Sequence, residues 1–151
     1  TIDPPIPGGG GSRCVVLDTI VRTSKGECEI NDVNGRDYVD NYSYQSRIIS
    51  TKTGIVTELV HIESSNKLKL SGSMWHRLIQ SSQDAVGISL KTLQEGDNVL
   101  TCIDGKYEIA TIVKRVVERG NFIVKSIRLP KPHLFITNGF VSHNAKPLED
   151  F

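Results

Sequence analysis

Residues 67–71 read KLKLS, and their polar and apolar side chains alternate one by one. This period of two is typical of a β-strand that buries one of its faces. Short apolar or β-branched clusters, which favour strands, lie on both sides of it along the chain. They are residues 15–17, 20–21, 48–49, 55–56, 59–60, 99–100, 112–113 and 123–124.

Turn signals separate these clusters: Lys25-Gly26, Asn34-Gly35, Thr53-Gly54, Glu95-Gly96-Asp97, Asp104-Gly105 and Gly120-Asn121. Many short strands with frequent turns predict an all-β domain, built as a sandwich, a barrel or a folded-over sheet. Helical periodicity is weak, and we expect at most one or two short helices, over residues 75–83 and 90–93. Residues 38–45 contain three tyrosines without a clear period, which indicates a loop or an insertion.

Composition narrows the function classes. The chain has 151 residues, enough for one globular domain, and a formal net charge of +1, which gives no strong attraction to nucleic acid or to an anionic membrane. Neither a signal peptide nor an apolar run of about 20 residues is visible, so we expect a cytoplasmic protein. Cys14, Cys28 and Cys102 lack CxxC spacing, so we expect no disulfide framework and no metal, with Cys28 and Cys102 in structural positions.

The two ends differ from the middle. Residues 1–13 read TIDPPIPGGGGSR, in which the prolines favour extended backbone and the glycines form what resembles an engineered linker. Residues 145–151, AKPLEDF, form a short polar tail. The sequence therefore predicts a flank at 1–13, one folded domain at 14–144 and a tail at 145–151.

Reactive groups lie at both edges of that domain. Cys14 opens it, and His143 and Asn144 close it. A cysteine thiol can attack the preceding carbonyl, here that of Arg13, and convert the peptide bond to a thioester. An asparagine amide can attack its own main-chain carbonyl, form a succinimide and cut the chain after Asn144. Both reactions are intramolecular, so a fold that brings the two ends together can accelerate both.

Histidine is the expected proton donor, because its pKa lies near neutrality. The chain has four: His61, His76, His133 and His143. Ser73-x-x-His76 places a hydroxyl three residues before an imidazole, and His133 lies ten residues before His143. His61, between two apolar residues, is expected to pack or to face solvent. Taken alone, each of these residues has an ordinary structural explanation, and only their combination points to chemistry.

Four segments, in order, resemble those of inteins, the self-splicing domains of the Hint fold. They are Cys14-x₃-Asp18-Thr19 with Thr23-x-x-Gly26, Ser73-x-x-His76, Leu93-x-x-Gly96-Asp97-x-Val99, and the closing stretch from His133 to His143-Asn144. The ending is similar to that of inteins in phage terminase large subunits. The resemblance covers residues 14–144, which is the length of a mini-intein without an endonuclease domain.

The resemblance implies a horseshoe-like Hint fold and a role for each matched residue. Cys14 would be the nucleophile at Arg13, His76 would protonate the departing nitrogen, and Ser73 would polarise that peptide bond. His143 would assist cyclisation of Asn144, and His133 would orient Asn144 or shuttle its proton. The implied partners are the chain's own flanks, with no cofactor, no nucleic acid and no membrane, and we expect a monomer of bacterial or phage origin.

Three positions depart from the family pattern. The position after Asn144 is Ala145, which has no nucleophile, so ligation of the flanks is blocked; we interpret this as a substitution that traps the precursor. Ser126 stands where the family usually has an aspartate that couples the two cleavages, and Ser73 replaces a threonine. Three alternatives stay open: a natural autocleaving relative that does not ligate, a cysteine hydrolase acting on other proteins, and a non-catalytic β module. A former break between two chains is also possible near residues 34–44 or 81–84.

Overall fold

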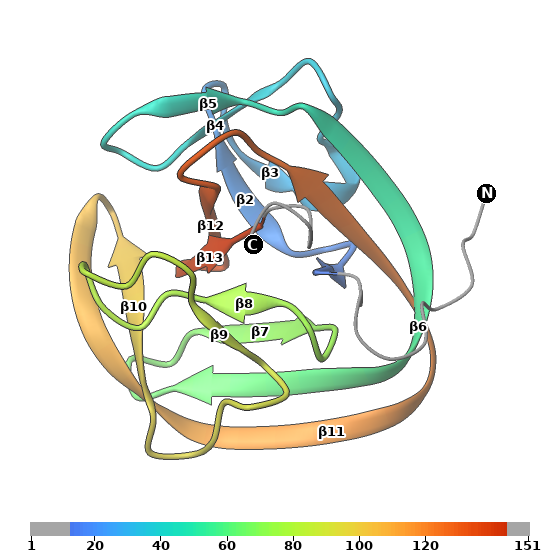
Figure 1. Cartoon of the computed structure of the whole chain (residues 1–151), viewed down its shortest axis with the longest axis vertical. Helices are drawn as coiled ribbons and strands as arrows, with labels where there is room; N and C mark the ends of the chain where they lie inside the picture. The colour runs from blue at the N-terminus through green and yellow to red at the C-terminus, as the bar shows by residue number, and fades with distance from the viewer. Residues whose placement is uncertain (1–12, 145–151) are drawn as a thin grey trace.

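The computed structural model describes residues 13–144, so the flank at 1–12 and the tail at 145–151 lie outside the description. The described part is almost entirely antiparallel β structure, as predicted (Figure 1). Its strands are β1 (Val15–Val16), β2 (Ile20–Thr23), β3 (Gly26–Glu29), β4 (Tyr38–Asp40), β5 (Gln45–Arg47), β6 (Ser50–Ser64), β7 (Lys69–Gly72), β8 (Arg77–Leu78), β9 (Ile88–Ser89), β10 (Asn98–Ile103), β11 (Lys106–Arg128), β12 (Leu134–Thr137) and β13 (Phe140–His143).

One 13-stranded sheet contains all of these strands, in the order β1-β7-β6-β11-β10-β13-β12-β2-β4-β5. β3 joins at β2, β8 joins at β13, and β9 joins at β8. β1 pairs with β11 as well as with β7, so the four strands β1, β7, β6 and β11 close on one another. The opening strand of the domain is thus held on both sides.

A long curved ribbon of β6 and β11 forms the outside of the molecule (Figure 1). The prediction of turns at Thr53-Gly54 and Gly120-Asn121 was wrong, because both pairs lie inside these strands. Gly54 pairs with Val124, and Gly120-Asn121 falls at a register shift between Arg119 and Phe122. A glycine inside a strand often marks a bulge or bend rather than a chain reversal.

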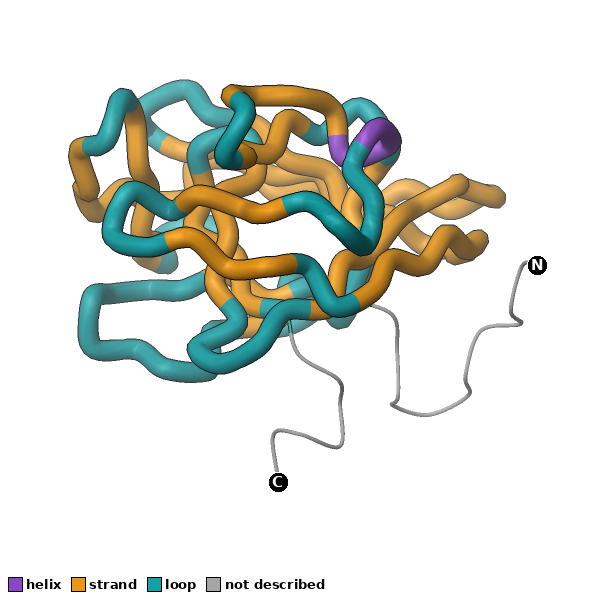
Figure 2. The backbone as a smooth tube through the Cα atoms, turned by 90° about the horizontal axis from the view of Figure 1, so that it is seen from above, coloured by secondary structure: helices purple, strands orange, loops and turns teal. Residues whose placement is uncertain are grey.

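Some of the other predictions of local structure are confirmed and others are not. The turns at Glu95-Gly96-Asp97 and Asp104-Gly105 are confirmed. The helices expected over residues 75–83 and 90–93 are absent from residues 13–144, whose one helical element is the 3-10 turn η1 (Ile30–Asp32), drawn in purple in Figure 2. Residues 38–45, predicted as a loop or an insertion, contain β4, a loop at residues 41–44 and the first residue of β5. Residues 48–49 link β5 to β6.

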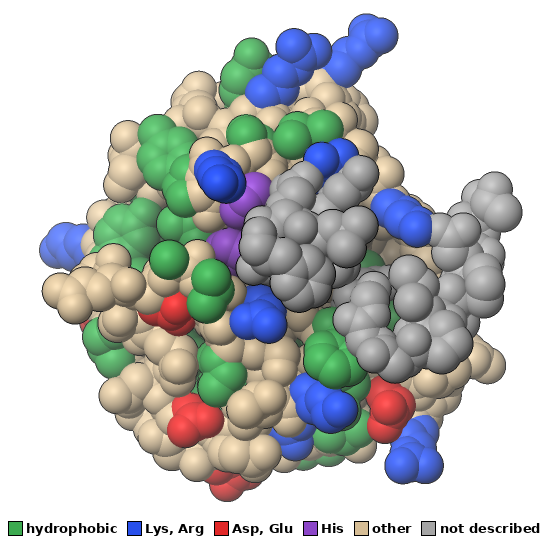
Figure 3. Space-filling view, in the orientation of Figure 1, with side chains coloured by type: hydrophobic (Ala, Val, Ile, Leu, Met, Phe, Trp, Pro, Cys, Tyr) green, Lys and Arg blue, Asp and Glu red, His purple; other side chains and the backbone are tan. Residues whose placement is uncertain are grey.

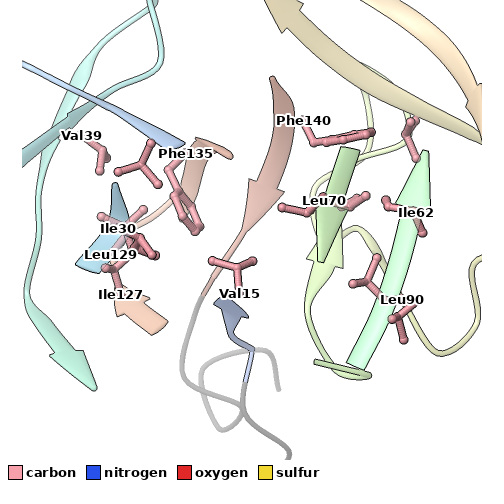
Figure 4. Packing of buried hydrophobic residues seen from close by; sticks show 14 of the residues in the cluster. Val15, Ile30, Val39, Ile62, Leu70, Leu90, Ile127, Leu129, Phe135 and Phe140 are labelled. Atoms are coloured by element: carbon pink, nitrogen blue, oxygen red, sulfur yellow. The ribbon is translucent and has the colours of Figure 1, made fainter. Parts of the chain in front are cut away.

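The core lies where the layers of the folded sheet meet. Val15 packs in a large buried cluster with residues of both halves of the chain, and Figure 4 shows it between Phe135 and Leu70. Burying each such side chain stabilises the fold by roughly 2 kcal/mol. A smaller cluster contains Cys14, Leu59 and Val124. Within residues 13–144, no helix is long and apolar enough to cross a membrane.

Candidate functional site

The Arg13–Cys14 peptide bond is held by Ser73. The Cys14 N–H donates to Ser73 Oγ at 3.0 Å, and the Ser73 N–H donates back to the Cys14 carbonyl at 2.9 Å. Both residues are buried, with 3% of their surface exposed. Pairing of Val15 with Gly72 brings them together, because each lies one residue beyond that pair. The nitrogen of the expected scissile bond is therefore fixed by a side-chain hydroxyl in a dry site.

Gly72 makes this close approach possible. A Cβ atom at this position would lie 2.9 Å from the Cys14 carbonyl oxygen and 3.2 Å from Leu90 Cδ1. Those distances are shorter than van der Waals contact allows, so no other residue fits without a shift of the Cys14 backbone. Gly72 was not among the site residues expected from the sequence, although the pattern Ser71-Gly72-Ser73 beside Ser73-x-x-His76 was the available signal.

His76 lies fully buried beside the same peptide bond. Its Nε2 is 2.8 Å from Ser142 Oγ, and its ring meets Phe135 edge-on with centroids 6.5 Å apart. Among the described residues, no atom meets full hydrogen-bond geometry with His76 Nδ1. The Arg13 backbone nevertheless lies close enough to raise the pKa of the His76 ring. Burial dominates and lowers the pKa of His76 to about 3, and the charges of Arg13 and His143 act in the same direction. The imidazole is therefore neutral at pH 7.

Asn144 is anchored at the other end of the domain. Its N–H donates to the His133 carbonyl at 2.8 Å, and its Nδ2 donates to the Ile127 carbonyl at 2.5 Å. His133 Nδ1 lies 2.7 Å from the Leu129 carbonyl, which can only accept, so Nδ1 carries the ring proton. The His133 and His143 rings lie with centroids 5.3 Å apart at an angle of 70°. Figure 3 shows histidine side chains reaching the surface near the centre of one face.

Strand β11 brings the two junctions to one place. Val15 pairs with Lys125, and continuing that antiparallel register by one residue puts Cys14 opposite Ser126. The next residue, Ile127, supplies the carbonyl that binds Asn144. Ser126 is half-buried and pairs on its other side with Lys52 of β6. The expected coupling position therefore lies between the opening cysteine and the closing asparagine.

The site residues expected from the sequence fall into three groups. Cys14, Ser73 and His76 converge on one junction; His133, His143 and Asn144 converge on the other; Ser126 lies between them. Ala145 lies outside the described residues. No group of three His, Cys, Asp or Glu side chains within residues 13–144 is arranged to hold a metal ion.

The other candidates lie apart from these contacts. His61 is half-exposed and hydrogen-bonded to Ser71 and Glu118. Cys28 packs against the main core and Cys102 lies in a separate buried cluster. Burial raises the pKa of both thiols, which makes them poor nucleophiles.

Two further residues of the site were not found from the sequence. Ser142 and Thr137 bond to each other at 2.6 Å behind His76. The signal available in the sequence was that Ser142 directly precedes His143 in the closing stretch that resembles inteins.

Comparisons with known proteins identify the fold. No family model matches the sequence, and no curated protein matches it. Among solved structures, a bacterial intein-like domain from Clostridium thermocellum covers 89% of this chain and 100% of its own, with a TM-score of 0.73 at 17% identity. The TvoVMA intein covers 87% and 98%, with a TM-score of 0.77 at 19% identity. The gp41-1 intein covers 87% and 98%, with a TM-score of 0.70 at 20% identity. The chain thus has the Hint fold of the inteins.

Proposed function

We propose that this chain, which has the fold of the inteins, is a self-splicing domain of residues 14–144 that acts once on its own flanking peptide bonds. The observation that carries the proposal is the meeting of both junctions at residues 126–127 of β11. Val15, next to Cys14, pairs with Lys125, and Asn144 binds the Ile127 carbonyl. The domain would act as a monomer and without a cofactor.

The first step is an N-to-S acyl shift at Cys14. The sulfur attacks the Arg13 carbonyl carbon, the bond from that carbon to the Cys14 nitrogen breaks, and a thioester forms. The nitrogen gains one proton and the thiol loses one, so no net proton is consumed. His76 would deliver the proton, because its ring lies beside Arg13, and Ser73 would hold the nitrogen while the bond breaks.

The second step is cyclisation of Asn144. Its Nδ2 attacks its own main-chain carbonyl carbon, a succinimide forms, and the bond to the nitrogen of residue 145 breaks. The Ile127 carbonyl holds Nδ2 in position. His143 would supply the proton to the departing nitrogen, and His133, whose Nε2 is available as an acceptor, would take the proton that Nδ2 loses.

Ligation needs a nucleophile directly after Asn144 to take the acyl group from Cys14. Ala145 has none, so the chain would form the thioester and cleave after Asn144 without joining its flanks. Ser126 would couple the two cleavages weakly, because a hydroxyl does not exchange a proton near neutral pH as a carboxyl group does.

The same observations weigh against the alternatives. A hydrolase for other proteins needs an accessible nucleophile, but Cys14 is 3% exposed and packs against Leu59 and Val124. A non-catalytic β module gives no reason for the contacts of Ser73 and His76 at the Arg13–Cys14 bond. A natural autocleaving domain shares every step except ligation, and the identity of residue 145 separates it from a splicing domain.

The deciding experiment is Ala145→Cys followed by intact-mass measurement over time. We expect excision of residues 14–144 and a product in which residues 1–13 are joined to residues 145–151. The same change with Cys14→Ala should give cleavage after Asn144 and no joined product. If Ala145→Cys protein, shown to be folded by circular dichroism, keeps its full mass after days with thiol, the splicing proposal is wrong. Cleavage of added peptides with both junctions intact would favour the hydrolase.

A further inference from the structure

A chain of three buried groups starts at His76 and runs away from the Arg13–Cys14 bond. His76 Nε2 lies 2.8 Å from Ser142 Oγ, and Ser142 Oγ lies 2.6 Å from Thr137 Oγ1. Thr137 Oγ1 also lies 3.5 Å from the Phe140 carbonyl. The side chains of His76, Ser142 and Thr137 are fully buried. Neither Ser142 nor Thr137 takes part in the two proposed reaction steps.

The β12–β13 hairpin brings the two hydroxyls together. Thr137 pairs with Phe140 at its closed end, and Ser142 pairs with Phe135 further along. Ser142 also pairs with Leu78 of β8, the strand that directly follows His76. The backbone of the last strand therefore fixes the Ser142 hydroxyl against the imidazole.

Either hydroxyl could donate in the Thr137–Ser142 bond, and the distances favour donation by Thr137. The Thr137–Ser142 contact is short, whereas the Thr137–Phe140 carbonyl contact is at the outer limit of a hydrogen bond. The Thr137 proton is therefore best placed toward Ser142, which leaves the Ser142 proton free to point at His76 Nε2. A neutral imidazole carries one ring proton, so an Nε2 that accepts requires a proton on Nδ1.

We propose that Ser142 is a positioning residue that donates to His76 Nε2, keeps the ring proton on Nδ1 at the Arg13–Cys14 bond, and is itself oriented by Thr137. The effect of Ser142 on catalysis rests on the proposed function, whereas the hydrogen bonds themselves do not depend on it. A donor at Nε2 favours loss of the Nδ1 proton to the Cys14 nitrogen, because it stabilises the negative charge that develops on the ring. The proton released by the Cys14 thiol then restores the neutral ring.

Self-cleavage kinetics test the role of the hydroxyls. In the full chain, the rate at which a small thiol releases residues 1–13 is measured by intact mass. Ser142→Ala should lower it about tenfold or more, a part of what general acid catalysis contributes. Thr137→Val, which keeps the shape, should lower it about fivefold, and Thr137→Ser, which keeps the hydroxyl, should stay within about twofold of the original rate.

A second serine–threonine pair provides the matched control. Ser89 Oγ donates to Thr92 Oγ1 at 3.1 Å, and Ser89 is buried like Ser142. Ser89→Ala should leave the release rate unchanged. If Ser89→Ala and Ser142→Ala slow release equally, or if Ser142→Ala does not slow it, the positioning role is overturned.

A direct readout of the ring proton separates this inference from the proposed function. Nitrogen-15 NMR of His76, in the full chain with Cys14→Ala to keep the junction intact, should show a protonated Nδ1 and an unprotonated Nε2. The additional change Ser142→Ala should lower the fraction of that tautomer. A proton on Nε2 in the parent chain would overturn the inference even if thiol releases residues 1–13. The expected tautomer in a chain that thiol does not cleave would support the hydrogen-bond assignment and count against the splicing function.

Discussion

Lowering the pH from 7 to 5 should destabilise the fold through one buried imidazole. His76 is fully buried, and its pKa in the folded protein is lowered from 6.5 to about 3. Between these two values the unfolded chain binds a proton at His76 that the folded protein does not bind. The unfolded state is therefore favoured as the pH falls from 6.5 toward 3, and above 6.5 the effect vanishes.

The size of the effect at pH 5 follows from the linkage relation. The folded group is neutral at pH 5, whereas the unfolded group is almost fully protonated. The loss of stability from this one residue is then about 2 kcal/mol at pH 5, and it would reach about 4 kcal/mol at pH 3. At pH 5 the figure depends on the unfolded pKa alone, since the folded group has not begun to titrate.

Urea unfolding at pH 7 and pH 5 measures this loss. His76→Gln is the matched variant, because glutamine can bond to Ser142 but does not titrate. Both proteins carry Cys14→Ala and Asn144→Ala, so that neither junction reacts during the measurement. Other titrating groups are common to the two proteins, so the parent should lose about 2 kcal/mol more than His76→Gln. An equal loss in the two proteins would mean that burial does not keep His76 neutral.

Three further changes have expected outcomes. Gly72→Ala should destabilise the fold by about 1–3 kcal/mol in urea unfolding and slow the thiol-dependent release of residues 1–13, because the added Cβ would press on the Cys14 carbonyl. Gly54→Ala is the control: no atom lies within 4 Å of its Cβ, so the release rate should be unchanged. Lys125→Met should lower the free energy of unfolding by about 2 kcal/mol, because the Lys125 ammonium donates to two carbonyls at the η1 turn. Ser126→Asp, combined with Ala145→Cys, should raise the ratio of spliced to cleaved product in an intact-mass time course. No change in that ratio would contradict the coupling role of this position.

The alternation in residues 67–71 and the Gly-Asp turns allowed much of the fold to be predicted. A turn such as Asp104-Gly105 is decided by local backbone preference, since both residues have positive φ there. Gly54 carries the same kind of local signal, yet it lies within β6. The strand conformation of Gly54 depends on pairing with Val124, seventy residues away in the chain. A local sequence pattern does not contain that information.

The missing helix over residues 75–83 has a similar cause. His76 is followed by β8, whose pairs lie in β9 and β13. Two-residue strands leave no period to read in a sequence, so a short apolar segment resembles a helical turn.

The sequence was enough to predict most of the residues that belong to the site, but not how they contact one another. The motifs that resemble inteins give Cys14, His76 and Asn144, but the contact of His76 with Ser142 joins residues far apart in the chain. Gly72 is needed for a reason that only the backbone geometry reveals, namely its approach to the Cys14 carbonyl.

The order in which the pieces of this site occur along the polypeptide has a consequence for its biosynthesis. One partner of β1, Gly72, is synthesised in the first half of the domain, whereas its other partner, Lys125, and the Ser142 hydroxyl that contacts His76 follow near the end of the domain. A nascent chain that stops short of β13 lacks the assembled environment of Cys14. Under the proposed function, we therefore expect thioester formation at the opening junction to begin only after β13 has been synthesised.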